Sequence, residues 1–253
     1  WDIKGKALGQ PVYKLLGGAR DRLPTYASGH LWRTYDLEAL ADSAHQIVDH
    51  GFRAMKIRIG GERKFVDEVA RLHTVRGAVG DNIDIMVDVN QSWDVHQAIV
   101  IGRRLEEYRP FWLEDPTNHQ DFTGHASIAE ALDTPIAGGE YHYGIEPFRT
   151  ALEGHSVDIA MVDLMRVGGL TQWMKVAHMA EAFNVPVVSH LATEILAHAV
   201  AAAPNGLTVE HMPWTFPLFR EVPAVEDGQI VLPQRPGLGL EFDENAIAKF
   251  QVE

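Results

Sequence analysis

Ile83-Asp84-Ile85-Met86-Val87-Asp88-Val89-Asn90-Gln91-Ser92-Trp93 is the stretch of the sequence that decides the fold. Its apolar residues lead into a carboxylate, Asp88, and then into a carboxamide and a polar turn. An apolar run bounded by turn residues is typical of a buried strand. We therefore expect a strand that delivers Asp88 to its C-terminal end.

The same pattern recurs twice, because residues 111–116 and 135–140 also run from apolar residues into an acid just before a loop. Asp88, Glu114 and Glu140 follow one another at intervals of 26 residues, which fits one strand, one helix and a return per step. In a parallel barrel such steps place successive strand ends around one mouth. Three carboxylates there would repel one another without a hard cation, and oxygen-only ligands favour Mg²⁺. We expect one ion per site.

Alternating strand and helix patterns continue along the chain and favour a parallel α/β barrel over an open sheet. The expected strands cover residues 23–28, 53–59, 83–88, 111–114, 136–140, 157–165, 186–190 and 207–210. The expected helices cover residues 36–50, 65–79, 98–105, 122–132, 170–183 and 194–203. Eight strands are the number that a TIM-type barrel requires.

The two flanks differ from the barrel pattern. Residues 1–20 have apolar positions and end near Gly17-Gly18, which predicts a connector helix that ends at glycine. We assign residues 21–212 to the barrel. Residues 213–253 are rich in proline and glycine, and we expect them to pack back over the molecule without regular elements.

Composition excludes several classes of function. The 253 residues carry a formal net charge of −13 and contain no Lys/Arg cluster, so nucleic-acid binding is not expected. Cysteine is absent, which excludes disulfides, thiolate zinc sites and a cysteine nucleophile. The sequence contains no run of about 20 apolar residues of the kind that spans a membrane, and its N-terminus does not resemble a signal peptide. We expect a cytoplasmic homo-oligomer that acts on a small carboxylate.

Other predicted strands also end in chemically useful side chains. Lys56 and Arg58 alternate on one strand and so share a face, while Asp163, His190 and Glu210 end the last three strands. Each taken alone has an ordinary explanation, such as a helix cap, an ion pair or a satisfied buried histidine. Taken together they indicate a site, because barrel interiors are normally filled with Val, Ile and Leu.

The ordered set of motifs resembles the mandelate racemase group of the enolase superfamily. The matching segments are Lys56-Ile57-Arg58, Asp88-Val89-Asn90, Glu114-Asp115-Pro116, Gly139-Glu140, Asp163-Leu164-Met165-Arg166-Val167-Gly168-Gly169, Ser189-His190-Leu191 and Glu210-His211. The resemblance implies a modified TIM barrel, (β/α)7β, with the N-terminal α+β capping domain missing from this chain. Residues 210–219 look most like the acid-sugar dehydratases of the group, of the galactarate/talarate type.

The resemblance also implies roles for individual residues. It implies that the Mg²⁺ ligands are Asp88, Glu114 and Glu140, that Asp163 and His190 form a dyad, and that Lys56 and Glu210 stabilise an enolate. Removing a proton α to a carboxylate requires stabilisation of the dianion that forms. Lys56 can donate to one carboxylate oxygen, and Glu210, if burial keeps it protonated, can donate to the other.

Side-chain chemistry indicates which residue serves as the general base. We expect Asp163 to orient His190, whose other ring nitrogen serves as general base or acid. Many relatives carry a second lysine where this sequence has Arg58, and a guanidinium stays protonated. This difference counts against a racemase, which needs a base on each face of the α-carbon. Asn90 is expected to contact substrate or, equally, to form a turn, and His30, Trp32 and Tyr141 are further candidate substrate contacts.

The leading hypothesis is a Mg²⁺-dependent hydro-lyase that converts a sugar acid into a 2-keto-3-deoxy acid. A racemase or epimerase of a 2-hydroxy acid is the nearest alternative. A catalytically silent metal-binding barrel is an alternative from another class, although His190 and Asp163 argue against it. A metal-dependent hydrolase is disfavoured because the sequence contains no paired His-x-His.

Overall fold

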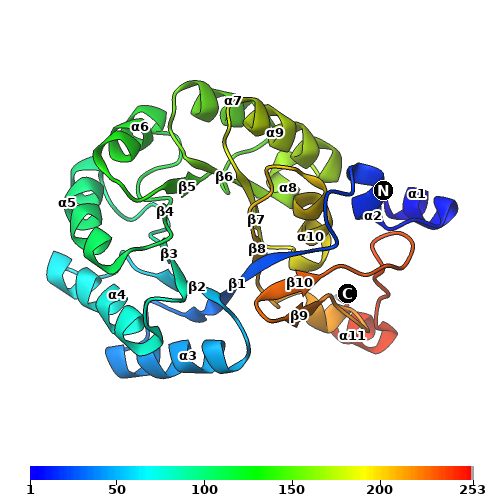
Figure 1. Ribbon diagram of the computed structural model, residues 1–253, viewed down its shortest axis with the longest axis horizontal. Coiled ribbons are helices and arrows are strands. Elements are labelled where there is room, and N and C mark those ends of the chain that lie inside the picture. The colour runs from blue at the N-terminus through cyan, green and yellow to red at the C-terminus, as the bar shows by residue number, and fades with distance from the viewer. Residues whose placement is uncertain (252–253) are drawn as a thin grey trace.

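A ring of parallel strands with helices outside it forms the centre of the computed structural model, which describes residues 1–251 (Figure 1). Strands β1 to β7 pair in sequence order, and β8 pairs with β1. An isolated bridge from Val187 to Gly206 links β7 to the residues just before β8. The predicted TIM-barrel-like α/β fold is therefore confirmed.

Seven strand-and-helix steps and a final strand make up the ring, which is the (β/α)7β order. The strands are β1 (Arg22–Leu31), β2 (Ala54–Arg58), β3 (Asp84–Asp88), β4 (Trp112–Glu114), β5 (Ile136–Gly138), β6 (Ile159–Asp163), β7 (Val187–His190) and β8 (Val209–His211). The helices are α3 (Leu37–Asp49), α4 (Phe65–Val79), α5 (Val95–Leu105), α6 (Phe122–Ala131), α7 (Glu146–Glu153), α8 (Leu164–Val167), α9 (Leu170–Ala182) and α10 (Thr193–Ala202). A 3₁₀ turn, η1 (Glu106–Tyr108), extends α5.

Aspartate caps begin several barrel helices. Asp36 accepts from the backbone of Ala39 at the start of α3, and Asp94 forms a reciprocal capping box with Gln97 at the start of α5. Such caps stabilise a helix by about 0.5–2 kcal/mol each. The sequence analysis placed no helix between β5 and β6, and α7 with Pro147 in its first turn is therefore a correction.

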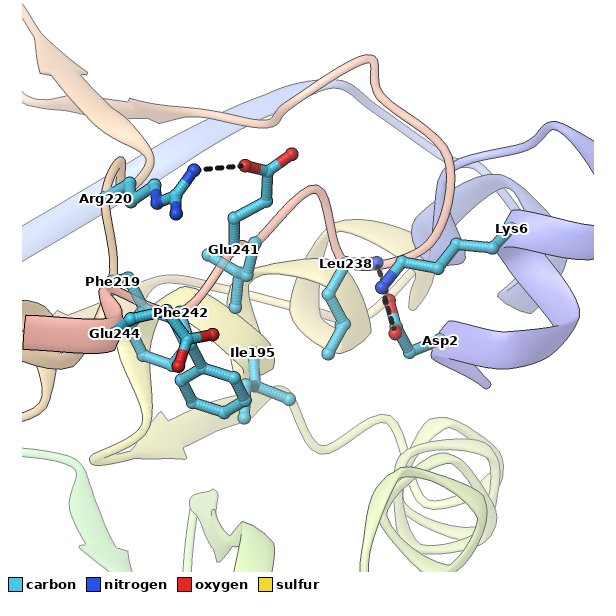
Figure 2. Close-up of a pocket in the computed structure, with 10 residues that line it drawn as sticks. Asp2, Lys6, Ile195, Phe219, Arg220, Leu238, Glu241, Phe242 and Glu244 are labelled. Atoms are coloured by element: carbon cyan, nitrogen blue, oxygen red, sulfur yellow. Dashed lines mark hydrogen bonds and ion pairs between the residues drawn. The ribbon is translucent and has the colours of Figure 1, made fainter. Parts of the chain in front are cut away.

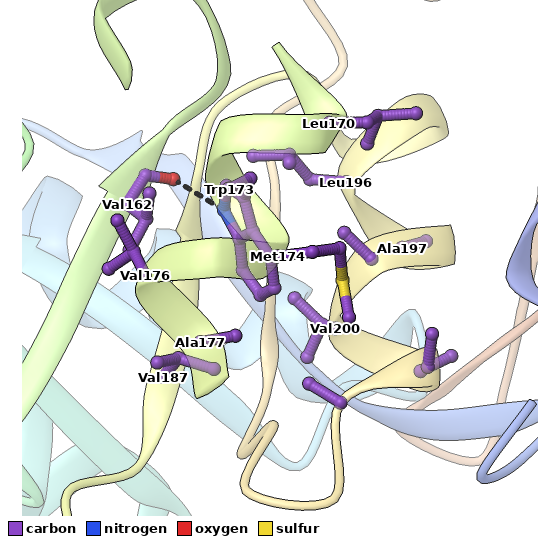
Figure 3. Packing of buried hydrophobic residues seen from close by; sticks show 14 of the residues in the cluster. Val162, Leu170, Trp173, Met174, Val176, Ala177, Val187, Leu196, Ala197 and Val200 are labelled. Carbon is purple, nitrogen blue, oxygen red and sulfur yellow. Dashed lines mark hydrogen bonds between the residues drawn. The ribbon is translucent and has the colours of Figure 1, made fainter. Parts of the chain in front are cut away.

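Large apolar side chains fill the space between the strands and the helices. Trp173 of α9 is fully buried, and its indole N–H donates to the carbonyl of Val162 on β6 at 3.1 Å (Figure 3). Leu196 and Val200 of α10 belong to the same cluster. Burial of such side chains stabilises the fold by roughly 1.5–3 kcal/mol each. This packing fixes β6 and β7, whose ends carry two of the candidate residues.

The flanking segments are more regular than the sequence predicted. The connector forms two short helices, α1 (Asp2–Leu8) and α2 (Val12–Leu16). The tail contains η2 (Phe216–Leu218), the hairpin of β9 (Ala224–Glu226) and β10 (Gln229–Val231), and α11 (Glu244–Phe250). The expectation of a tail without regular elements is wrong, since β10 extends the sheet antiparallel to β1.

Connector and tail contact each other directly. The Asp2 carboxylate accepts from the backbone of Leu238 at 2.9 Å and pairs with Lys6 at 2.7 Å, beside a pocket of about 420 Å³ (Figure 2). Helices α1 and α11 lie on the same side of the barrel (Figure 1). Among residues 1–251, no helix combines the length and apolar character needed to cross a bilayer.

Candidate active site

Strand register brings the candidate residues together at one end of the barrel. Arg58 lies opposite Asp88 in the β2–β3 pairing, Asp88 lies opposite Glu114 in β3–β4, and Asp163 lies opposite His190 in β6–β7. All of these residues end their strands, so the register collects them at the C-terminal mouth, where barrel enzymes place their chemistry.

Lys56 is the buried cation at the centre of this mouth. Its Nζ lies 2.7 Å from Glu114 Oε1, 3.0 Å from Glu210 Oε1 and 3.8 Å from Asp88 Oδ2, and all four side chains are at most 1% exposed. Burial alone would lower the pKa of Lys56, but the carboxylates of Glu114 and Glu210 raise it well above its usual value. Lys56 therefore stays charged, and its contacts fix it in place.

The pKa values of the two glutamates that share Lys56 are shifted in opposite directions. Burial raises the pKa of Glu114 well above its usual value, and the nearby Asp88 adds to the effect. Burial also acts on Glu210, but Lys56, His190 and the backbone N–H of Leu191, at 2.7 Å, lower its pKa to about 2. The expectation that burial keeps Glu210 protonated is therefore wrong. The lowered pKa favours the ionised form of Glu210, which accepts a hydrogen bond from the backbone N–H of Leu191.

The carboxylates suit a hard divalent cation in their chemistry. Asp88 and Glu114 are neighbours, and Glu140 follows β5, the next strand of the ring. As they stand, no three His, Asp or Glu side chains in residues 1–251 are gathered tightly enough to hold a metal ion. The expected convergence on one point is thus not formed in this arrangement, in which the Lys56 ammonium pairs with Glu114. An all-oxygen, buried and strongly acidic donor set still fits Mg²⁺.

A histidine–aspartate pair faces the carboxylates. His190 Nδ1 lies 2.7 Å from Asp163 Oδ2, and His190 Nε2 lies 3.3 Å from Glu140 Oε2. Burial alone raises the pKa of Asp163, but hydrogen bonds from His190 and from the Arg166 backbone lower it. An ionised carboxylate accepts only, so Nδ1 carries the hydrogen and Nε2 is left free to take a proton.

His190 is also a stronger base than an ordinary histidine. Burial lowers its pKa, but the hydrogen bond to Asp163 and the charges of Glu140 and Glu210 outweigh burial, and the net pKa is raised above the usual value. The predicted hydrogen bond between the ends of β6 and β7 is present.

Arg58 is held against an aromatic wall. Its guanidinium carbon lies 4.5 Å from the centre of the Trp32 ring, and the Trp32 and Trp214 rings stack at 6.5 Å with an angle of 2° between their planes. Arg58 Nε lies 3.5 Å from Asp88 Oδ2. Its Nη1 is buried and has no hydrogen-bond partner within residues 1–251. The guanidinium thus has capacity for a further acceptor at the mouth.

Comparison with known proteins identifies the family. The family model described as enolase C-terminal domain-like matches residues 39–246, most of the chain. The chain belongs to the enolase C-terminal domain-like family. L-talarate/galactarate dehydratase of Salmonella typhimurium is 34% identical over 97% of this chain, which spans 62% of that protein's length. The resemblance to the mandelate racemase group is confirmed.

Solved structures agree with this assignment. L-talarate dehydratase from Polaromonas sp. JS666, complexed with Mg and L-glucarate, superposes with a TM-score of 0.94 at 34% identity, over 98% of this chain and 69% of that one. A racemase from Streptomyces coelicolor A3(2) with bound magnesium gives a TM-score of 0.95 at 32% identity, over 100% of this chain and 70% of that one.

The candidate substrate contacts of this enolase-like barrel lie in different places in the structure. Trp32 lies at the mouth, and Tyr141 lies beside Glu140. Burial and the charge of Glu140 raise the pKa of Tyr141 above its usual value. His30 is misplaced by the sequence analysis. With His50 and His211 it lines a groove of about 500 Å³ between α3 and the tail, outside the ring. The sequence analysis ended the first strand at residue 28 and placed His30 in a loop, whereas β1 continues to Leu31 with a register shift between Ala27 and Leu31.

Asn90 forms a turn, which is one of the two roles expected for it. Its amide nitrogen donates to Asp88 Oδ2 at 2.9 Å, and its amide oxygen accepts from Arg33 at 2.7 Å. One N–H and one lone pair of this side chain therefore serve the protein, and the substrate contact stays a prediction.

Sequence reasoning assigned no role to several residues at the mouth. Asp115 is fully buried, and neither of its oxygens has a hydrogen-bond partner in the described part of the chain. Arg166 lies 3.5 Å from Asp163 and donates to the carbonyl of Glu140. Arg166 lies three residues after Asp163, in the last turn of the short helix α8 that Asp163 caps. Arg33 lies in a loop with no pattern that could have marked it.

Proposed function

We propose that the protein removes the proton α to the carboxylate of a sugar acid and eliminates the β-hydroxyl as water, giving a 2-keto-3-deoxy acid. The observation that carries this proposal is the dyad, because Asp163 holds His190 Nδ1 and directs Nε2 toward the acidic mouth. In the reaction the α C–H bond breaks and its proton goes to Nε2. His190 Nε2 returns that proton to the β-hydroxyl as the β C–O bond breaks, so that the group leaves as water. The resulting enol then loses its hydroxyl proton and takes a proton from solvent at C3, which gives the ketone.

The proposal includes one Mg²⁺ held by Asp88, Glu114 and Glu140. The named relatives were crystallised with magnesium, and the donor set of this chain consists of carboxylates. When bound, the ion would stabilise negative charge on the substrate carboxylate. Lys56 supplies a second, protein-borne positive charge beside the same carboxylates, held by Glu210 at 3.0 Å.

Arg58 favours elimination over racemisation. A racemase needs a competent base on each face of the α-carbon, and a guanidinium does not deprotonate in proteins. Arg58 is held by Trp32 and Asp88, where it can donate to a substrate oxygen. A racemase or epimerase remains the second candidate, since one structural relative is named a racemase.

The test is a panel of sugar acids incubated with the purified protein and Mg²⁺, with keto products detected by semicarbazide. We expect at least one acid to give a keto product, and the His190→Asn variant to give none. Change of optical rotation without a keto product would favour the racemase. No turnover of any acid, with magnesium bound, would favour a catalytically silent barrel.

A further inference from the structure

The loop after β1 carries an arginine that reaches over the ends of two other strands. Arg33 Nε donates to the carbonyl of Ile59 at 2.5 Å, just after β2, and Arg33 Nη2 donates to the carbonyl of Val89 at 2.7 Å, just after β3. The same Nη2 donates to the side-chain oxygen of Asn90 at 2.7 Å. One planar guanidinium therefore ties three consecutive strand ends together.

Asn90 links Arg33 to Asp88 by hydrogen bonds. Its side-chain nitrogen donates to Asp88 Oδ2 at 2.9 Å, and its backbone N–H donates to Asp88 Oδ1 at 2.9 Å. Both oxygens of Asp88 are thus held by a single residue, whose amide oxygen is in turn held by Arg33. Rotation of the Asp88 carboxylate would break one or both of these bonds.

The turn that makes this contact is strained. Asn90 has φ of 46° and the following residue, Gln91, has φ of 62°, both in the left-handed region. Residues other than glycine hold this region at a cost of about 1–3 kcal/mol unless the surrounding structure fixes them, although asparagine tolerates it best. Gln91 is fixed by its backbone N–H, which donates to the carbonyl of Asp115 at 2.7 Å. Arg33 holds the same turn through the carbonyl of Val89 and the side-chain oxygen of Asn90.

We propose that Arg33 is a positioning residue that acts through Asn90 to orient the Asp88 carboxylate for the metal ion. The inference rests on the proposed function for the identity of Asp88 as a ligand. No ion pair links Arg33 to Asp88 within residues 1–251, whereas Lys56 and Arg58 both lie within 4.0 Å of it. Arg33 therefore affects Asp88 through the hydrogen bonds of Asn90 and not through a direct ion pair. Partners that orient metal ligands typically contribute 10- to 100-fold to metal affinity.

The experiment measures Mg²⁺ and Mn²⁺ binding by calorimetry on the full-length protein without substrate. Arg33→Lys keeps the positive charge but loses the fork that reaches several acceptors. Asn90→Gly removes the side chain at a position where glycine is unstrained. We expect each variant to raise the metal Kd by about 10- to 100-fold. We expect the double variant to bind no more weakly than Asn90→Gly, because Arg33 acts through Asn90.

Arg20 provides a matched control. Its Nη2 also donates to two backbone carbonyls, those of Ala203 and Gly206 at 3.0 and 2.6 Å, but away from the carboxylates. We expect Arg20→Lys to leave the metal Kd unchanged even if its Tm falls. If Arg33 only stabilised the fold, Arg33→Lys would lower Tm, as Arg20→Lys does, and would leave the metal Kd unchanged.

Three outcomes would overturn the proposal, and they are distinguishable. A metal Kd unchanged in Arg33→Lys, with normal binding by the wild type, refutes the positioning role and leaves the proposed function intact. Additive losses in the double variant refute the route through Asn90. A wild-type protein that binds neither ion refutes the metal site itself. If Arg33→Lys fails to fold, a Kd unchanged in Asn90→Gly refutes the link.

Discussion

Replacement of Lys56 with methionine tests the electrostatics of the mouth. Methionine roughly preserves the length of the side chain but removes the charge that Glu114, Glu210 and Asp88 share within 3.8 Å. Removing one partner of a buried ion pair costs about 3–5 kcal/mol, because the remaining charge stays buried without a partner. Against a typical total stability of about 5–15 kcal/mol, this loss is large.

The loss should depend on pH and on metal. Without Lys56 the folded-state pKa values of Glu210 and Glu114 rise, and a carboxyl group with a raised folded pKa destabilises the fold increasingly as pH rises. We therefore expect the variant to lose more stability at pH 8 than at pH 5. Mg²⁺ at about 100 times its Kd should restore about 2.7 kcal/mol, since it supplies positive charge to the same carboxylates.

Urea unfolding of both proteins, with and without Mg²⁺, measures these differences. Lys6→Met is the matched control, because the exposed Lys6–Asp2 pair at 2.7 Å should contribute at most about 1 kcal/mol. A loss for Lys56→Met no larger than that of the control, or one independent of pH, would refute the view that Lys56 compensates buried carboxylates.

Three further predictions concern the dyad and the strand ends. His190→Asn should lower kcat by at least about 10²- to 10⁴-fold while metal affinity is retained, and near-normal rates would show that the base is wrongly assigned. Asp163→Asn should move the acidic limb of the kcat/KM profile to lower pH, because Asp163 raises the pKa of His190; an unmoved limb would contradict the dyad. Gly60→Ala should lower Tm, since Gly60 has φ of +92° and a Cβ would lie 2.9 Å from Ser92 and 3.0 Å from the Val89 carbonyl; an unchanged Tm would show that this turn can relax.

The barrel was predictable because its signals are local. Each strand that ends in an acid is an apolar run of a few residues, and the strand register follows once the strands are known to be parallel. The hydrogen bond between Asp163 and His190 was predictable for the same reason, since adjacent strand ends must meet. The hairpin of β9 and β10 carried a signal that was overlooked, because Asp227-Gly228 is a strong turn sequence and both residues have positive φ.

Other features depend on contacts that no local pattern encodes. His30 lines the groove beside α3 because β1 extends to Leu31 with an irregular register, whereas the sequence predicted a strand that ended at residue 28 and a loop after it. The ionised state of Glu210 depends on Lys56 at 3.0 Å and on the backbone of Leu191 at 2.7 Å, which are set by packing. Arg33 emerges only when the ends of three strands are seen together.

Proton exchange with solvent tests the central claim most directly. Sugar acids are incubated with the protein and Mg²⁺ in D₂O, and the products are followed by NMR. The account predicts that the α-hydrogen of a reactive acid is lost and that a 2-keto-3-deoxy acid appears with one solvent deuterium at C3. With His190→Asn neither change should occur. Formation of the keto acid at an undiminished rate by that variant would contradict the account.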